Sequence, residues 1–148
     1  MPRIHPFKAL RPLPNIAAQV ASVPYDTVSA SEARTLAEGR PNSFLHVVRP
    51  EIDLPPDADP HGPEAHRQAR LGLDRLRAEG VLVQEDQPSI YLYRMAGGGH
   101  RQIGIVACCE IAEYESGVIR KHELTRPDKE DDRTRHLLAA GAHTEPLV

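Results

Sequence analysis

The chain has 148 residues, of which 40% are hydrophobic and 26% charged, and its formal net charge at pH 7 is -3. This length suffices to bury one hydrophobic core, so we expect a single domain over residues 1–148. The net charge argues against a domain that holds nucleic acid by a large basic excess, and no apolar run approaches the roughly 20 residues of a membrane span. Because the first residues also lack a signal-peptide pattern, we expect a cytoplasmic protein.

The first elements along the chain are short. Residues 4–29 are punctuated by prolines, which favours extended segments and edge strands over helices. Ser29 and Glu32 then have the spacing of a capping box. Together with Gly39, a natural C-terminal stop, they predict a helix at about residues 30–38.

The next segment, NSFLHVVRPEIDLP, predicts a buried strand. Its apolar residues lie between Phe44 and Val48, and on such a strand His46 would be a core histidine. Arg49 and Glu51 flank a proline just beyond the strand. We expect them to form a structural ion pair.

The longest helical signal begins at Pro63 and ends at Gly80. Its apolar residues recur at helical spacing, and we expect this face to pack on a sheet. The residues of this face are Ala65, Ala69, Leu73 and Leu76. His61 and His66 have no partner at metal-ligand spacing, so we expect both on the surface.

Three β-like segments follow: VLVQE, SIYLYRM and RQIGIVACCEI. The glycines at 97–99 predict a hairpin turn between the second and the third. Ile90 and Leu92 alternate with Tyr91 and Tyr93, which indicates a strand with two different faces.

The two cysteines, Cys108 and Cys109, are adjacent. In a strand their side chains would point to opposite faces, so they cannot easily bridge each other. We expect small core residues in a reducing compartment.

Residues 121–133, KHELTRPDKEDDR, concentrate charges of both signs. We expect GVIRKHE to begin a strand, with the charged stretch at its end, and Thr125 to Leu138 to form a helix that Thr125 and Asp128 cap. A solvated helix stabilised by an Asp131–Arg135 pair is one interpretation. The other is a ligand site, because open α/β sheets place ligands beside strand carboxyl ends.

A helix N-terminus at this place would suit a phosphate group. Four basic residues could neutralise the remaining phosphate charge: Lys121, Arg126, Lys129 and Arg133. The acidic residues are too many for phosphate alone, but a Mg²⁺ ion that bridges carboxylate and phosphate oxygens would reconcile both signs. The metal-binding candidates are Asp128, Glu130 and Asp132. From spacing alone the structural and functional interpretations stay equally open.

Four segments together resemble a bacterial and archaeal family, the domain of unknown function 1015 (DUF1015). They are PYDTVSASEAR, NSFLHVVRPEIDLP, EGVLVQEDQPSIYLYR and SGVIRKHELTRPDKEDDR. The resemblance covers nearly the whole chain in order, and KHExTRPDKExDR is a specific signature. Family members normally continue to more than twice this length, so the chain resembles an amino-terminal part.

The family is distantly similar to the ParB/sulfiredoxin-like superfamily, in which a strand, a turn and a helix N-terminus hold phosphate. The resemblance therefore implies an α+β fold with a mixed sheet and packed helices. The superfamily includes kinases of free serine, and relatives of this family are similar to ATP-dependent versions. This implies ATP and Mg²⁺ as cofactors, adds His122 to the phosphate binders, and makes Glu123 the first candidate for the base and Asp26 the second. Asp26 is equally interpretable as a turn or cap residue.

Ser43 and Asn42 are candidates for contacting the substrate amino acid, or else they cap a strand. A nucleotide-binding, ParB-like sensor without catalysis is the alternative function, and a structural fragment of a longer protein is a third. The expected partners are a nucleotide and a small-molecule substrate, without a membrane or nucleic acid, and a homodimer stays open.

Overall fold

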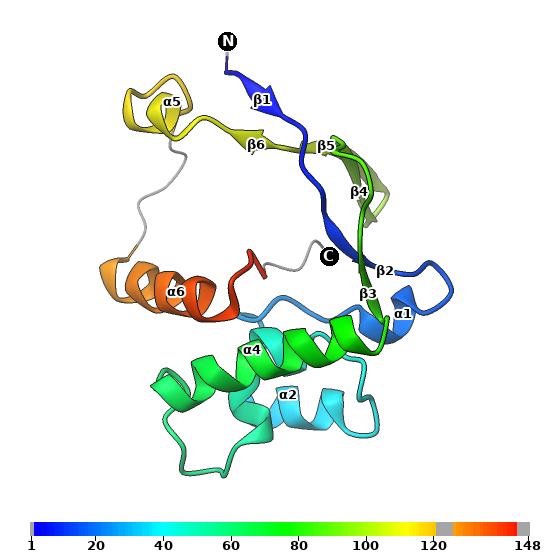
Figure 1. The fold of residues 1–148 in the computed structure, drawn as a ribbon, viewed down its shortest axis with the longest axis vertical. Coiled ribbons are helices and arrows are strands. Elements are labelled where there is room, and N and C mark those ends of the chain that lie inside the picture. The colour runs from blue at the N-terminus through cyan, green and yellow to red at the C-terminus, as the bar shows by residue number, and fades with distance from the viewer. Residues whose placement is uncertain (1, 121–125, 145–148) are drawn as a thin grey trace. The chain divides into compact units, whose positions relative to one another are not determined.

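The computed structural model describes residues 2–120 and 126–144, apart from the side chain of Asp128. It shows an α+β protein with small antiparallel sheets and packed helices (Figure 1). The chain forms two compact units. We call residues 1–11 and 84–125 the strand unit, and residues 12–83 and 126–148 the helical unit.

The strand unit contains two antiparallel ladders. β1 (Ile4–His5) pairs with β6 (Cys108–Cys109), and β4 (Tyr91–Gly97) pairs with β5 (His100–Val106). Gly98 and Gly99 both have positive φ angles in the turn between β4 and β5, as a tight hairpin requires. The predicted hairpin is therefore confirmed, but small antiparallel ladders replace the expected mixed sheet.

The two faces of β4 differ, as the alternation of its residues predicts. Tyr91 and Tyr93 are half-buried, whereas Leu92 is 76% exposed. The Tyr91 hydroxyl donates to the carbonyl of Phe7 and accepts from the amide of Ala9, both at 3.0 Å. Tyr91 thus ties the first residues of the chain to the hairpin.

Two expectations for the strand unit are wrong. Cys108 and Cys109 are exposed and not in a core, because β6 is a two-residue strand in a ladder too short to have a buried face. The residues after α5 (Ile111–Glu115) do not begin a strand as far as residue 120. Gly117 adopts a positive φ, and the amide of Ile119 donates to the carbonyl of Glu113, so the chain closes the helix end instead.

The chain passes between the units at β2 (Leu10–Pro12) and β3 (Leu82–Gln84). The opening of the helical unit contains a short helix, α1 (Ala17–Val20), where the prolines favoured extended structure. α2 (Ala30–Ala37) follows, with the predicted capping box: Ser29 Oγ accepts from the amide of Glu32, whose carboxylate accepts from the amide of Ser29. Gly39 has a φ of 66°, which confirms the predicted stop.

The predicted strand at residues 44–48 is wrong. These residues form α3 (Leu45–Val48), followed by the 3-10 helix η1 (Pro50–Asp53). Leu45 and Val48 belong to the hydrophobic core with Ile52 and α2, while Val47 faces α4. A short helix that is buried on two sides has the same continuous apolar run as a buried strand, so periodicity cannot separate them.

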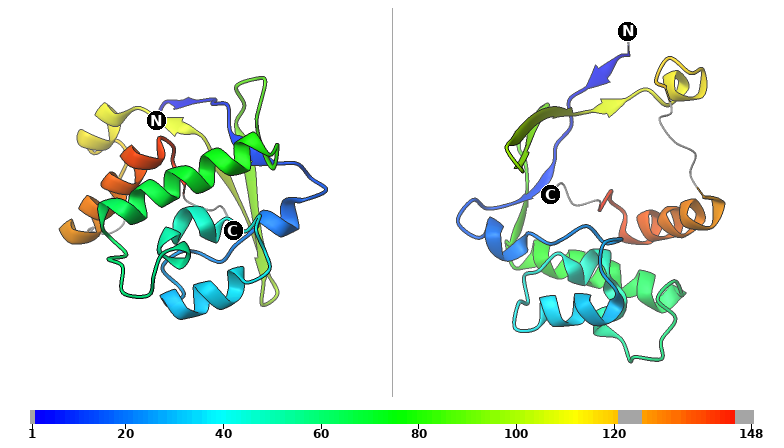
Figure 2. Two further views of the ribbon diagram at one scale, coloured as in Figure 1. Left: turned by 60° about the horizontal axis from the view of Figure 1, so that its bottom comes forward. Right: turned by 180° about the vertical axis from the view of Figure 1, so that it is seen from behind.

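The longest helix, α4 (Pro63–Ala78), has nearly the predicted bounds, and all four predicted apolar residues are buried. Its packing partners are α3, η1 and α6 (Pro127–Ala140). Figure 2 shows α6 alongside α4. The expectation that this helix packs on a sheet is therefore wrong, and the helix lies between two others.

Candidate functional site

The charged helix α6 begins at Pro127 and has Arg126 as its N-cap residue. The predicted cap at Thr125 is thus wrong in register, and Thr125 itself lies outside the described residues. Asp132, His136 and Ala140 are buried at a spacing of four residues, which places them on one face of the helix. The inward face of α6 therefore carries polar, titratable side chains.

The carboxylate of Asp132 joins three segments of the helical unit, although only 6% of the residue is exposed. One oxygen, Oδ2, accepts from Arg133 Nη2 at 2.8 Å and from Nε at 3.3 Å. The other, Oδ1, lies 2.9 Å from His61 Nδ1 and 3.5 Å from His66 Nε2. Burial would raise the pKa of Asp132, yet the hydrogen bonds from Arg133 and His61 hold that pKa below its usual range.

The expectation of two surface histidines is wrong for His66 and confirmed for His61. His66 is buried on α4, because it faces α6 rather than solvent. His61 remains 56% exposed at its side chain, but it lies against Asp132. A contact between α4 and α6 joins residues far apart in the chain, so local spacing carried no signal of it.

Arg133 also contacts the segment SVPYD from the beginning of the helical unit. Its guanidinium carbon lies 4.4 Å from the centre of the Tyr25 ring, a cation–π distance. The backbone of this segment is fixed by Arg49, whose Nη1 donates to the carbonyls of Tyr25 at 2.6 Å and Val28 at 2.7 Å. Arg49 Nε donates at 2.6 Å to the buried Glu51, which confirms the predicted ion pair. Three sequence motifs thus converge: PYD, RPE and EDDR.

His136 lies one helical turn after Asp132 on α6 and is only 2% exposed. Its Nε2 is 3.0 Å from Thr144 Oγ1, and its ring meets the ring of His66 edge-on, with centroids 6.1 Å apart. Burial, followed by the charge of Arg133, lowers the pKa of His136 to about 4. His136 is therefore neutral at pH 7.

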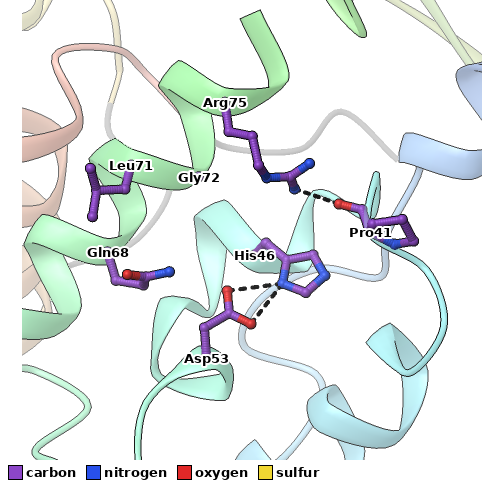
Figure 3. Close-up of a pocket in the computed structure, with 7 residues that line it drawn as sticks. All are labelled: Pro41, His46, Asp53, Gln68, Leu71, Gly72 and Arg75. Carbon is purple, nitrogen blue, oxygen red and sulfur yellow. Dashed lines mark hydrogen bonds and ion pairs between the residues drawn. The ribbon is translucent and has the colours of Figure 1, made fainter. Parts of the chain in front are cut away.

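A separate cavity of about 310 Å³ opens in the helical unit between α3, η1 and α4 (Figure 3). His46 Nδ1 lies 2.9 Å from both carboxylate oxygens of Asp53, and its Nε2 lies 3.2 Å from the carbonyl of Arg40. The hydrogen bond to Asp53 raises the pKa of His46 above its usual value. Arg75 donates to the carbonyl of Pro41. The polar groups of His46, Asp53 and Arg75 in this cavity are thus already engaged within the protein.

The structure describes only some of the other residues of the predicted site. Lys121, His122 and Glu123 lie outside the described residues. Asp26 is exposed and directly follows Tyr25. Arg126, Lys129 and Glu130 are exposed near the start of α6, where Asp128 also lies. Within residues 2–120 and 126–144, no three His, Cys, Asp or Glu side chains are arranged to hold a metal ion.

The predicted substrate residues Asn42 and Ser43 lie just before α3. Ser43 is fully buried, and its Oγ accepts from the amide of Leu45 at 3.4 Å. Asn42 donates to the side chain of Gln19 at 3.2 Å. Phe44 is the N-cap residue of α3, and no side chain caps this helix, so neither residue has the capping role that was the alternative.

Sequence reasoning missed the histidines around Asp132. One signal was present: Asp132, His136 and Ala140 recur with the spacing of a buried helix face. The opposite partner, His66, also shares a helical face with Ala65 and Ala69, which were predicted to be buried.

Comparisons with known proteins give one match. The sequence model of the family described as "Protein of unknown function (DUF1015)" matches residues 4–148. No curated protein and no solved structure matches the chain. In the described part of the chain, no helix combines the length and the apolar character that a membrane span requires.

Proposed function

Since the chain belongs to the DUF1015 family, we propose that it is an ATP-dependent kinase of free L-serine with a ParB/sulfiredoxin-like phosphate platform. The observation that carries the proposal is the contact between Tyr25 and Arg133. The exposed Asp26 directly follows Tyr25 in the PYD motif and belongs to the same unit as the charged helix. A carboxylate beside a cation-rich helix start is the combination that phosphoryl transfer needs.

In this proposal the N-terminus of α6 and its basic side chains hold the nucleotide phosphates. Arg126, Lys129 and Arg133 lie in the first two turns of a 14-residue helix, whose free amide groups favour an anion. Lys121 and His122 directly precede these turns in the sequence and would add to the same site. The positive charge opposes the charge that accumulates on the transferred phosphoryl group.

The serine hydroxyl would attack the γ-phosphorus, ADP would leave, and a carboxylate would take the hydroxyl proton. Glu123 is the first candidate for this base, and Asp26 is the second. Mg²⁺ would neutralise phosphate oxygens when bound, and the exposed carboxylate of Glu130, together with Asp128 in the same helix turn, suits such a hard cation. Asp132 is a poorer ligand, because both of its oxygens already contact protein groups.

The test is calorimetry of the chain with ATP and Mg²⁺, followed by a phosphoserine assay with free serine. Arg133→Ala should weaken nucleotide binding, whereas Arg135→Ala is the matched control on the same helix, because Arg135 is exposed. Binding with product supports the kinase. Binding without product favours the sensor, and an absence of nucleotide binding refutes both.

A further inference from the structure

The guanidinium of Arg133 contacts Asp132 along one edge and the Tyr25 ring on one face. Its Nε and Nη2 donate to Asp132, and its plane is close to the Tyr25 ring. Within the described residues, Nη1 has no hydrogen-bond partner, and 25% of the side chain is exposed. Arginine carries five N–H donors in a fixed fork, so at least the Nη1 donors remain for an anion.

The contact between Asp132 and Arg133 is not a default helix pair. Consecutive side chains on a helix diverge and do not face each other. Asp132 points inward and is buried, so Arg133 must fold back along the helix to reach it. The geometry therefore depends on where the Asp132 carboxylate is held.

The carboxylate is held by groups outside α6. His61 Nδ1 and His66 Nε2 both approach Oδ1, the oxygen that Arg133 does not use. His66 belongs to α4, and His61 precedes that helix. The two oxygens of the carboxylate thus have different neighbours: Oδ1 lies against His61 and His66, and Oδ2 accepts from Arg133.

We propose that Asp132 is a positioning residue that orients Arg133 for binding the phosphate groups of the nucleotide. The identity of the anion rests on the proposed function, whereas the contact between Asp132 and Arg133 does not depend on it. It replaces the expectation that Asp132 binds a metal. The Asp132 carboxylate accepts two hydrogen bonds from the guanidinium of Arg133, and the ring of Tyr25 lies against that guanidinium.

For the loss of the Asp132 charge, the proposal predicts a change in nucleotide affinity opposite to the one that simple electrostatics predicts. A carboxylate beside a phosphate-binding arginine repels the phosphate, so removal of its charge alone should tighten binding. If Asp132 positions Arg133, Asp132→Asn should instead weaken it, because Arg133 loses its charged partner and its orientation. Asp131→Asn is the matched control, since it removes the same charge from an exposed neighbour on α6.

We would measure the affinity for Mg-ATP by calorimetry in the wild type and both variants. Asp132→Asn should bind about tenfold more weakly, and Asp131→Asn should bind equally or slightly more tightly. Equal or tighter binding by Asp132→Asn would overturn the proposal. His61→Ala changes an exposed side chain and so leaves the core intact; it should weaken binding less than Asp132→Asn, with exposed His143→Ala as its control.

A second readout separates this inference from the proposed function. The Nε–H group of Arg133 should give a slowly exchanging NMR signal in the wild type without any nucleotide, and Asp132→Asn should lose it. If the wild type does not bind ATP but this signal behaves as expected, the proposed function fails and the positioning contact stands. A signal unchanged in a folded Asp132→Asn variant would overturn the positioning contact.

Discussion

The backbone of Gly72 on α4 lies so close to α3 that an added Cβ would be 2.8 Å from the carbonyl oxygen of His46. A backbone carbonyl cannot rotate away as a long side chain can. The absence of a side chain at residue 72 therefore sets the distance between the two helices that line the cavity.

Gly72→Ala should destabilise the protein by about 1–3 kcal/mol, because α3 must shift to admit the methyl group. Gly97→Ala is the control, since Gly97 lies in β4, has no positive φ, and nothing lies within 4 Å of its added Cβ. Urea denaturation of the two variants measures the difference. Equal midpoints would contradict the close approach.

The buried His136 makes stability depend on pH. Its pKa in the folded protein is about 4, below its ordinary value of 6.5, so the unfolded chain binds more protons between these values. The free energy of unfolding should therefore fall as the pH falls from about 6.5 to 4, by up to about 3 kcal/mol from this residue. His136→Gln should flatten the profile in this window, and a profile as steep as that of the wild type would count against the assignment.

His46 should behave in the opposite way. Its pKa is raised by the hydrogen bond to Asp53, so its stabilising contribution is fully present below the unfolded pKa and is lost as the pH rises through the folded pKa. Asp53→Asn should lower the pKa of His46 in an NMR titration. Asp57→Asn, a change at an exposed loop residue, should leave that titration unaltered.

The capping box of α2 gives a local prediction. Ser29→Ala removes the side-chain acceptor for the amide of Glu32 and should cost about 1 kcal/mol of stability. Thr35→Ala, at an exposed residue of the same helix, removes only a bond to the carbonyl of Ser31. Because alanine favours helices, this control should be neutral or stabilising, as thermal unfolding would show.

The identity of the catalytic base is tested by two amide variants. Glu123→Gln should abolish turnover and leave nucleotide binding largely intact, since a proton acceptor acts in the chemical step. If Glu123→Gln turns over normally, Asp26→Asn should show this loss instead. Normal turnover by both single variants would leave neither carboxylate as the base.

The sequence predicted the elements whose signals are local. Ser29, Glu32 and Gly39 specify α2 within a few residues of chain, and the glycines at 98 and 99 specify the hairpin. α3 was missed because it is buried against both α2 and α4, which removes the helical periodicity.

The candidate site was only partly predictable for a related reason. Asp132 and Arg133 were identified from their charge, but the role of Asp132 depends on His61 and His66, which reach it only after α4 and α6 pack together. The meeting of Tyr25 with Arg133 is also tertiary. Local spacing contains no information about such pairs. The sequence therefore showed which charged residues the motif contains, but not which residues they contact.

The packing of α6 on α4 has a consequence for how the protein folds during translation. Residues 12–83 of the helical unit emerge before residues 84–125, and α6 follows only afterwards. Until then the side of α4 that carries His66 and Arg70 lacks its partner helix. The hairpin of β4 and β5, whose ladder pairs only near neighbours, can form at once. The helical unit should therefore mature late during translation, after the strands that interrupt its sequence.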